Sequence, residues 1–156
     1  ETNIAWFQRN SAAQSIGPDK LNQLRHVQLL GDADGLAAHM EKHRAILAPK
    51  FAAVDETFRA RLAPWGAGAW NAPLGGYFVS LDVLDGCAKR AVQLAKEAGI
   101  AVTPAGATFP YGEDPRDANI RIAPTFPPLA ELNEALDGLC TAILLAETEA
   151  LLAERN

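Results

Sequence analysis

The 156-residue sequence lacks the features of several classes of protein. It contains no basic run and its formal net charge is -5, so it offers no cluster of lysines and arginines that could neutralise nucleic-acid phosphates. Its longest apolar run is far shorter than the roughly 20 residues of a membrane helix, and its first residues do not form a signal-peptide pattern. These absences predict a cytoplasmic protein that binds neither nucleic acid nor a membrane.

The sequence also has few cysteines and histidines. Its two cysteines, Cys87 and Cys140, are far apart and have no Cys or His at metal-ligand spacing nearby, which favours free thiols over a zinc site or a disulfide framework. His39 and His43 share one face of a predicted helix, but the sequence offers no third ligand beside them. We therefore interpret this pair as part of a solvated helix face and predict no metal site.

What the sequence does contain is typical of a globular protein with a buried core, since 49% of its residues are hydrophobic and 21% are charged. Residues 1–32 predict two short helices separated by Gly17-Pro18. From Asp34 to Pro64, apolar residues recur at intervals of three, four and seven, which predicts one long amphipathic helix. Pro49 removes a backbone donor in the middle of this helix and should bend it.

The rest of the sequence predicts a mixture of strands and helices. The pair Gly75-Gly76 leads into a strand ending at Asp82, either because the backbone passes close to a ligand or another chain or because a hairpin turn follows Pro73. The further predicted elements are a helix at 85–99, strands at 100–102 and 119–123, a loop at 107–116 and a last helix at 127–153 that Thr125 can cap. The predicted fold class is α+β, with a long bent linking helix followed by a small domain of a short β-sheet packed with helices.

Arg121 is the main candidate for a ligand-binding residue. Successive side chains of a strand point to opposite faces, so Ile120 and Ile122 can face a core while Arg121 points the other way. A guanidinium can hold a carboxylate through two parallel charge-assisted hydrogen bonds. A carboxylate-bearing ligand is therefore the natural partner of this residue, and an arginine on a solvated strand face is the alternative.

Three stretches of the sequence carry a resemblance to a known family. They read Gly-Gly-Tyr-Phe-Val-Ser-Leu-Asp at 75–82, Ala-Lys-Glu-Ala-Gly-Ile-Ala-Val-Thr-Pro-Ala-Gly at 95–106 and Asn-Ile-Arg-Ile-Ala at 119–123. In this order, with a predicted helix between the first two, they resemble the C-terminal part of the fold-type I pyridoxal-phosphate aminotransferases, and in detail the aspartate aminotransferase-like subgroup. The resemblance extends from the helix near Trp6 to the last helix.

The resemblance implies roles for particular residues and segments. Arg121 matches the arginine that binds the substrate α-carboxylate, and Tyr77 and Phe78 lie where the family lines its substrate pocket. It further implies that residues 1–32 are a helical remnant of the large cofactor domain, 33–64 the linking helix and 65–156 the small domain. A homodimer, amino-acid and 2-oxo-acid substrates, and aspartate with 2-oxoglutarate as the favoured pair are implied in the same way.

The sequence departs from the family in its lysines. Transamination needs a lysine that binds pyridoxal 5'-phosphate in a loop beside a phosphate cradle. All five lysines fall in predicted helices, namely Lys20, Lys42, Lys50, Lys89 and Lys96. The family's lysine would lie upstream of Glu1, which itself suggests a processed or excised piece because it is not a methionine. We therefore expect no catalytic residue here, a cofactor bound mainly by the missing upstream part, and no activity of this chain alone.

Two questions stay open at the level of sequence. The residue that reads a distal substrate carboxylate is not identified, because the segment up to Arg25 lacks the family's usual arginine motif, although Arg25 itself is a candidate. The alternative function is a non-catalytic α+β module that binds an acidic metabolite or a protein partner, and the missing lysine is its main support.

Overall fold

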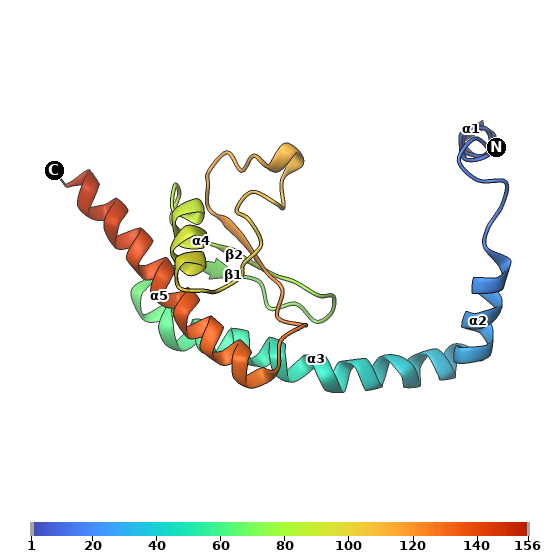
Figure 1. Cartoon of the computed structure of the whole chain (residues 1–156), viewed down its shortest axis with the longest axis horizontal. Helices are drawn as coiled ribbons and strands as arrows, with labels where there is room; N and C mark the ends of the chain where they lie inside the picture. Colours follow the sequence, from blue (N-terminus) through green and yellow to red (C-terminus); the bar gives the residue numbers. More distant parts are fainter. Residues whose placement is uncertain (1, 156) are drawn as a thin grey trace. The chain divides into compact units, whose positions relative to one another are not determined.

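The computed structural model describes residues 2–155, so Glu1 and the prediction made from it lie outside the described residues. The helices and strands follow in the order α1 (Thr2–Ser11), α2 (Lys20–Leu30), α3 (Ala33–Arg61), β1 (Ala69–Trp70), β2 (Val79–Asp82), α4 (Ala88–Glu97), β3 (Asn119–Ile122) and α5 (Leu129–Glu154), with 3-10 turns at Ala63–Trp65 and Pro110–Gly112 (Figure 1). The chain divides into two compact units, and the division falls inside α3 between Arg44 and Ala45.

The first unit contains α1, α2 and the beginning of α3. Asp19 caps α2 by accepting a hydrogen bond from the backbone N–H of Asn22 at 3.0 Å, and Asp32 caps α3 through the N–H of Gly35 at 2.9 Å. No residue of α1 or α2 is buried. Both helices nevertheless carry large, exposed apolar side chains, namely Ile4, Trp6, Phe7, Leu21, Leu24, Val27 and Leu29.

The second unit is built on a three-stranded antiparallel sheet in the order β1-β2-β3. Ser80 of β2 pairs with Arg121 of β3, and the neighbouring pair is Leu81 with Ile120. One sheet face is apolar and buried, because Leu81 and Ile120 point into a core that α3, α4 and α5 complete (Figure 1). The fully buried members of this core include Phe58, Leu62, Leu136, Cys140 and Ile143.

The segment before β2 is a hairpin connection. Because β1 pairs with β2, residues 71–78 form the loop between them, and β2 begins at Val79, later than the predicted strand. Gly76 has a φ of 89°, a left-handed conformation that favours glycine. A Cβ atom added at Gly75 or Gly76 would meet no other atom within 4 Å. The hairpin interpretation is therefore confirmed, and the approach of a ligand or another chain to the glycine pair stays a prediction.

Residues 100–102 do not form the predicted strand. This segment follows α4 without pairing to the sheet, and Ile100 packs on α5 at Gly138, where an added Cβ atom would overlap its side chain. The apolar character of residues 100–102 is thus explained by contact with α5. A short apolar run in a sequence looks the same whether it packs on a helix or pairs in a sheet. The last helix begins at Leu129, and no side chain caps its first turn, so the predicted cap at Thr125 is wrong.

The α+β class predicted from the sequence is confirmed, with the long helix α3 leading into a small sheet packed with helices. The boundaries at 32 and 64 stay predictions, since the two compact units meet within α3. Between residues 2 and 155, no helix combines the length and the apolar character needed to cross a membrane.

Candidate functional site

Arg121 occupies the polar face of β3. Ile120 and Ile122 on either side of it are buried, whereas Arg121 is half-buried, as the alternation of side chains along a strand requires. Its guanidinium carbon lies 4.5 Å from the centre of the Phe78 ring, in cation–π contact. The register of the sheet brings these residues together, because Phe78 is two positions before Ser80, the strand partner of Arg121.

Arg121 has no polar partner among residues 2–155. Its Nε atom is buried and makes no hydrogen bond, and its guanidinium forms no ion pair with the described carboxylates. Four other arginines of the second unit each donate to a carboxylate, namely Arg59, Arg61, Arg90 and Arg116. A buried donor without a partner is costly, so this unpaired cation is suited to an anionic ligand.

A polar network holds β3 beside Arg121. The side chain of Asn119 donates to Ser80 Oγ at 2.9 Å and to Asp82 Oδ1 at 2.6 Å, and accepts from Thr108 Oγ1 at 2.7 Å. Asp82 also accepts from Arg116 at 3.1 Å. The network joins β2, β3 and the loop before β3, so the strand that carries Arg121 is fixed on its polar face.

Asp114 fixes the start of β3, and sequence reasoning missed it. Its buried carboxylate accepts hydrogen bonds from the backbone N–H groups of Arg116, Ala118 and Asn119 at 3.0, 2.8 and 2.8 Å. Burial acts to raise the pKa of this carboxyl, but the three backbone donors outweigh burial and hold the pKa below its ordinary value. Asp114 lies in a predicted loop, where an aspartate that caps a turn has no sequence signal that sets it apart from a solvated one.

The hairpin loop carries both predicted pocket residues, and one of them contacts Arg121. Phe78 contacts Arg121 and is 47% exposed, and Tyr77 beside it in the chain is 58% exposed. The base of the hairpin is held by Asn71, whose backbone N–H donates to the Ser80 carbonyl at 3.2 Å and whose side-chain oxygen accepts from the Ser80 N–H at 2.7 Å. Phe78 therefore extends from a fixed position.

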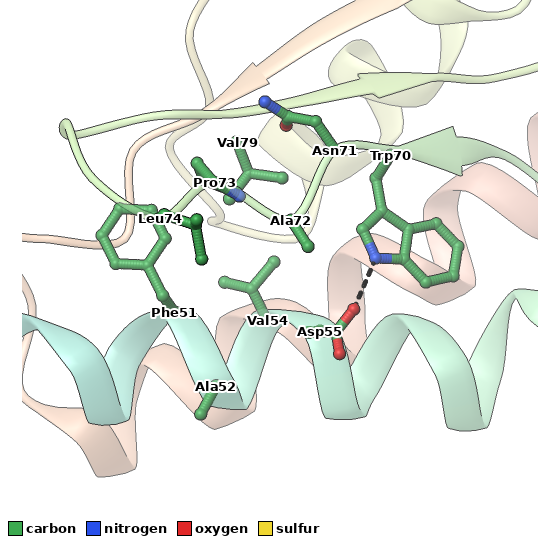
Figure 2. A pocket seen from close by; sticks show the side chains of 10 residues that line it. All are labelled: Phe51, Ala52, Val54, Asp55, Trp70, Asn71, Ala72, Pro73, Leu74 and Val79. Atoms are coloured by element: carbon green, nitrogen blue, oxygen red, sulfur yellow. Dashed lines mark hydrogen bonds between the residues drawn. The ribbon is translucent and has the colours of Figure 1, made fainter.

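The hairpin also packs on α3 around a small pocket of about 200 Å³ (Figure 2). Figure 2 shows Trp70 donating from its indole nitrogen to Asp55 Oδ1, at 2.9 Å, while Phe51 and Leu74 lie at the other end of the pocket. The second oxygen of Asp55 accepts from Arg59 at 2.7 Å. Because the one carboxylate of this pocket is fully used by the protein, we interpret the pocket as a packing feature that anchors the hairpin.

A larger cleft of about 790 Å³ borders β3. Arg121 is among its lining residues, together with the segment 98–103, the residues that follow β3 and the first turns of α5. Its walls are mostly apolar, and Glu131 and Glu134 of α5 add negative charge. The volume is in the range of small-molecule sites.

The other predicted site residues lie elsewhere. Arg25 is exposed on α2, which belongs to the first unit, whereas Arg121 belongs to the second. Both cysteines are free and buried, and burial raises the pKa of Cys140 to about 11, so its thiol is protonated at neutral pH. His43 and His39 contact each other at 3.0 Å. No group of three or more His, Cys, Asp or Glu side chains within residues 2–155 could hold a metal ion.

The lysines do not fit a covalent anchor for pyridoxal phosphate. Lys50 donates its ammonium to the backbone carbonyl of Thr125 at 2.6 Å. The remaining lysines are exposed on helices, namely Lys20, Lys42, Lys89 and Lys96. None of the five lines the cleft beside Arg121. The described residues thus present an unpaired guanidinium, but none of these lysines is placed to supply the amine of a Schiff base.

Comparison with known proteins places this geometry in context. The model of the aspartate amino-transferase family matches residues 1–155. A protein of Mycolicibacterium smegmatis described as an aminotransferase is 58% identical over 153 residues, which are 98% of this chain and 36% of that protein. The aspartate aminotransferase of Corynebacterium glutamicum is 50% identical over 147 residues, which are 94% of this chain and 34% of the enzyme.

Solved structures agree with these sequence relatives. The aspartate transaminase of Corynebacterium glutamicum superposes with a TM-score of 0.89 at 49% identity, over 95% of this chain and 35% of that one. The α-aminoadipate aminotransferase of Thermus thermophilus, solved with N-(5'-phosphopyridoxyl)-L-leucine, has a TM-score of 0.75 at 18% identity, over 94% and 36%. The latter likeness concerns the fold alone. The chain spans about a third of the length of the curated relatives it matches.

Proposed function

Because the chain belongs to the aspartate aminotransferase family, we propose that it is part of an enzyme that moves an amino group between an amino acid and a 2-oxo acid, and that Arg121 binds the substrate α-carboxylate. The observation that carries the proposal is the unpartnered guanidinium of Arg121. Both substrates of such a reaction carry a carboxylate next to the reacting carbon, so one fixed arginine can hold either of them.

The geometry supports a bidentate interaction. The guanidinium carbon of Arg121 lies over the Phe78 ring, a contact that uses none of the N–H donors in the plane of the group. Two parallel hydrogen bonds in that plane match the two oxygens of a carboxylate. The residue would therefore bind and orient the substrate by its carboxylate.

The substrate pair and the pocket belong to the same proposal. We propose aspartate and 2-oxoglutarate, with support from the 50% identical aspartate aminotransferase of Corynebacterium glutamicum. Tyr77 and Phe78 are proposed to line the substrate pocket, since both are exposed in the hairpin loop and Phe78 contacts Arg121. Arg25 is proposed to bind the distal carboxylate of the substrate, and the support for this role is its exposed positive charge alone.

The proposed cofactor is pyridoxal 5'-phosphate, which withdraws electrons from the amino-acid carbon when it is bound. No lysine of this chain fits the role of cofactor anchor. We therefore propose that residues outside these 156 hold the pyridoxal phosphate, and that the chain alone is inactive. The non-catalytic module considered from the sequence is less well supported, because the family model covers residues 1–155.

We further propose a homodimer in the cytoplasm. The exposed apolar side chains of α1 and α2, among them Trp6 and Phe7, are suited to burial against another surface. Sedimentation of the full-length protein at several concentrations tests this assembly. A monomer at the highest concentration would contradict it.

Kinetics of the full-length protein test the role of Arg121. Arg121→Lys keeps the charge and loses the paired geometry, and a charge-assisted hydrogen bond contributes roughly 1.5–3 kcal/mol, so kcat/KM should fall about one to two decades. Arg121→Ala should cost more. The loss should be similar for aspartate and for a neutral amino acid, since both share the α-carboxylate. An unchanged kcat/KM in Arg121→Ala would return Arg121 to a solvated strand position.

A further inference from the structure

We propose that Phe78 is a positioning residue that holds the guanidinium of Arg121 in the plane from which it meets the substrate carboxylate, an inference that rests on the proposed function. The family resemblance implies only that Phe78 lines a pocket. The structure adds a specific contact, since the guanidinium carbon lies 4.5 Å from the centre of the ring. An aromatic ring attracts a cation to its face, so this contact fixes the tilt of the guanidinium plane.

The need for such a positioning residue follows from the surroundings of Arg121. No hydrogen bond or ion pair within residues 2–155 fixes its guanidinium, and its Nε has no partner. An arginine side chain is long and has many rotamers, and ordering it on binding lowers affinity. The ring of Phe78 supplies order without using any N–H donor, so the terminal N–H groups of the guanidinium remain free for the ligand, whereas the Nε is buried.

The position of the ring is in turn fixed by the hairpin. Asn71 bonds both backbone groups of Ser80, two residues after Phe78, and Ser80 pairs with Arg121. At the base of β1, Trp70 donates to Asp55 of α3 (Figure 2). The ring and the guanidinium are therefore attached to neighbouring strands in a set register. Phe78 is 47% exposed, so its ring is not packed in the hydrophobic core.

Substitution of Phe78 separates positioning from pocket lining. In the full-length protein, Phe78→Leu should raise KM roughly three- to tenfold, with a smaller change in kcat, the range expected for loss of a cation–π contact. Phe78→Tyr keeps the ring and should stay near the wild type. Because the contact acts through Arg121, KM should rise by the same factor for aspartate and for a neutral amino acid. If Phe78 contacted the substrate side chain instead, the ranking of the two substrates would change.

A double substitution shows whether the effect passes through Arg121. In an Arg121→Ala background, Phe78→Leu should change KM by less than twofold, because there is no guanidinium left to position. Tyr111→Leu is the matched control, since it removes another aromatic ring that is fully exposed and has no described contact with Arg121. Thermal melting of each variant shows that the fold is retained.

The outcomes distinguish this inference from the proposed function. If Arg121→Ala has no effect on kcat/KM, the proposed function fails. If Arg121→Ala lowers kcat/KM while Phe78→Leu leaves KM unchanged, or if Phe78→Leu acts equally in the Arg121→Ala background, the function stands and the positioning role is overturned. A change in substrate ranking with Phe78→Leu would also overturn it.

Discussion

A half-buried guanidinium without a hydrogen-bond partner carries a free-energy cost that a ligand can remove. Arg121 is in this situation, because its Nε is buried and unpaired while other arginines of the same unit donate to carboxylates. A carboxylate that binds Arg121 neutralises the cation and accepts hydrogen bonds from its N–H donors. The same reasoning explains why lysine should be a poor replacement, since its ammonium cannot form the planar pair of hydrogen bonds.

At the residue scale, Asp114 predicts stability that depends on pH. The pKa of Asp114 is lowered in the folded chain. Burial is the largest single influence and acts to raise this pKa, but the three backbone N–H donors together lower it by more. A carboxyl with a lowered folded pKa stabilises the fold above its unfolded pKa, about 3.9, and this contribution is lost as pH falls through the folded pKa. Asp114→Asn should therefore lower Tm at pH 7, by an amount that shrinks below about pH 4.

Thermal unfolding followed by circular dichroism between neutral and acid pH measures this difference. Glu113→Gln is the matched control, because Glu113 is the exposed neighbour of Asp114 and makes no described side-chain hydrogen bond. Its Tm should follow the wild type at every pH. A difference between Asp114→Asn and the wild type that is the same at pH 7 and at acid pH would contradict the assigned role.

At the scale of elements, the loop before β3 supports the site through two glycines with different constraints. Gly106 is buried with a φ of 85°, and an added Cβ atom would overlap the carbonyl of Gly112. Gly112 has a φ of 76°, but a Cβ atom there would meet nothing within 4 Å. Gly112→Ala should therefore cost about 1–2 kcal/mol of unfolding free energy from strain alone.

Gly106→Ala should cost more than Gly112→Ala, by at least about 1 kcal/mol, because it adds a backbone clash to the same strain. Urea unfolding of both variants measures the two values. The loop carries Thr108 and Asp114, which hold Asn119 and the start of β3, so the larger loss should also disturb β3. Equal losses for the two variants would show that the close approach of Gly106 and Gly112 does not constrain the loop.

The elements also show what a sequence can predict. Alternation along Asn119–Ile122 predicted that Ile120 and Ile122 enter the core while Arg121 does not, because burial on one sheet face imposes a period of two. Asn119 is also buried, but by the polar network and not by the core. The apolar run at 100–102 gave a wrong strand, since packing of Ile100 on α5 leaves the same pattern. The contact of Phe78 with Arg121 depends on pairing between distant segments, which single-sequence patterns do not contain. The capping bonds of Asp114 are local, but a loop aspartate that caps a turn looks the same in sequence as a solvated one.

At the scale of the whole molecule, binding and chemistry are assigned to different parts of the proposed enzyme. The second unit contains a packed core and a sheet whose polar face presents Arg121. The five lysines of the chain are engaged or exposed on helices, so none is placed to anchor the cofactor. The family match and the relatives' greater length support a protein in which other residues provide that anchor.

The most direct test of the central claim is a crystal structure of the full-length protein with succinate, a dicarboxylate that has no amino group to transfer. Two nitrogens of Arg121 should lie about 2.7–2.9 Å from the two oxygens of one carboxylate, as in bidentate charge-assisted pairs, with Phe78 still against the guanidinium. A succinate held only by other cations, with Arg121 free or paired to a protein carboxylate, would contradict the claim that Arg121 is the carboxylate receptor.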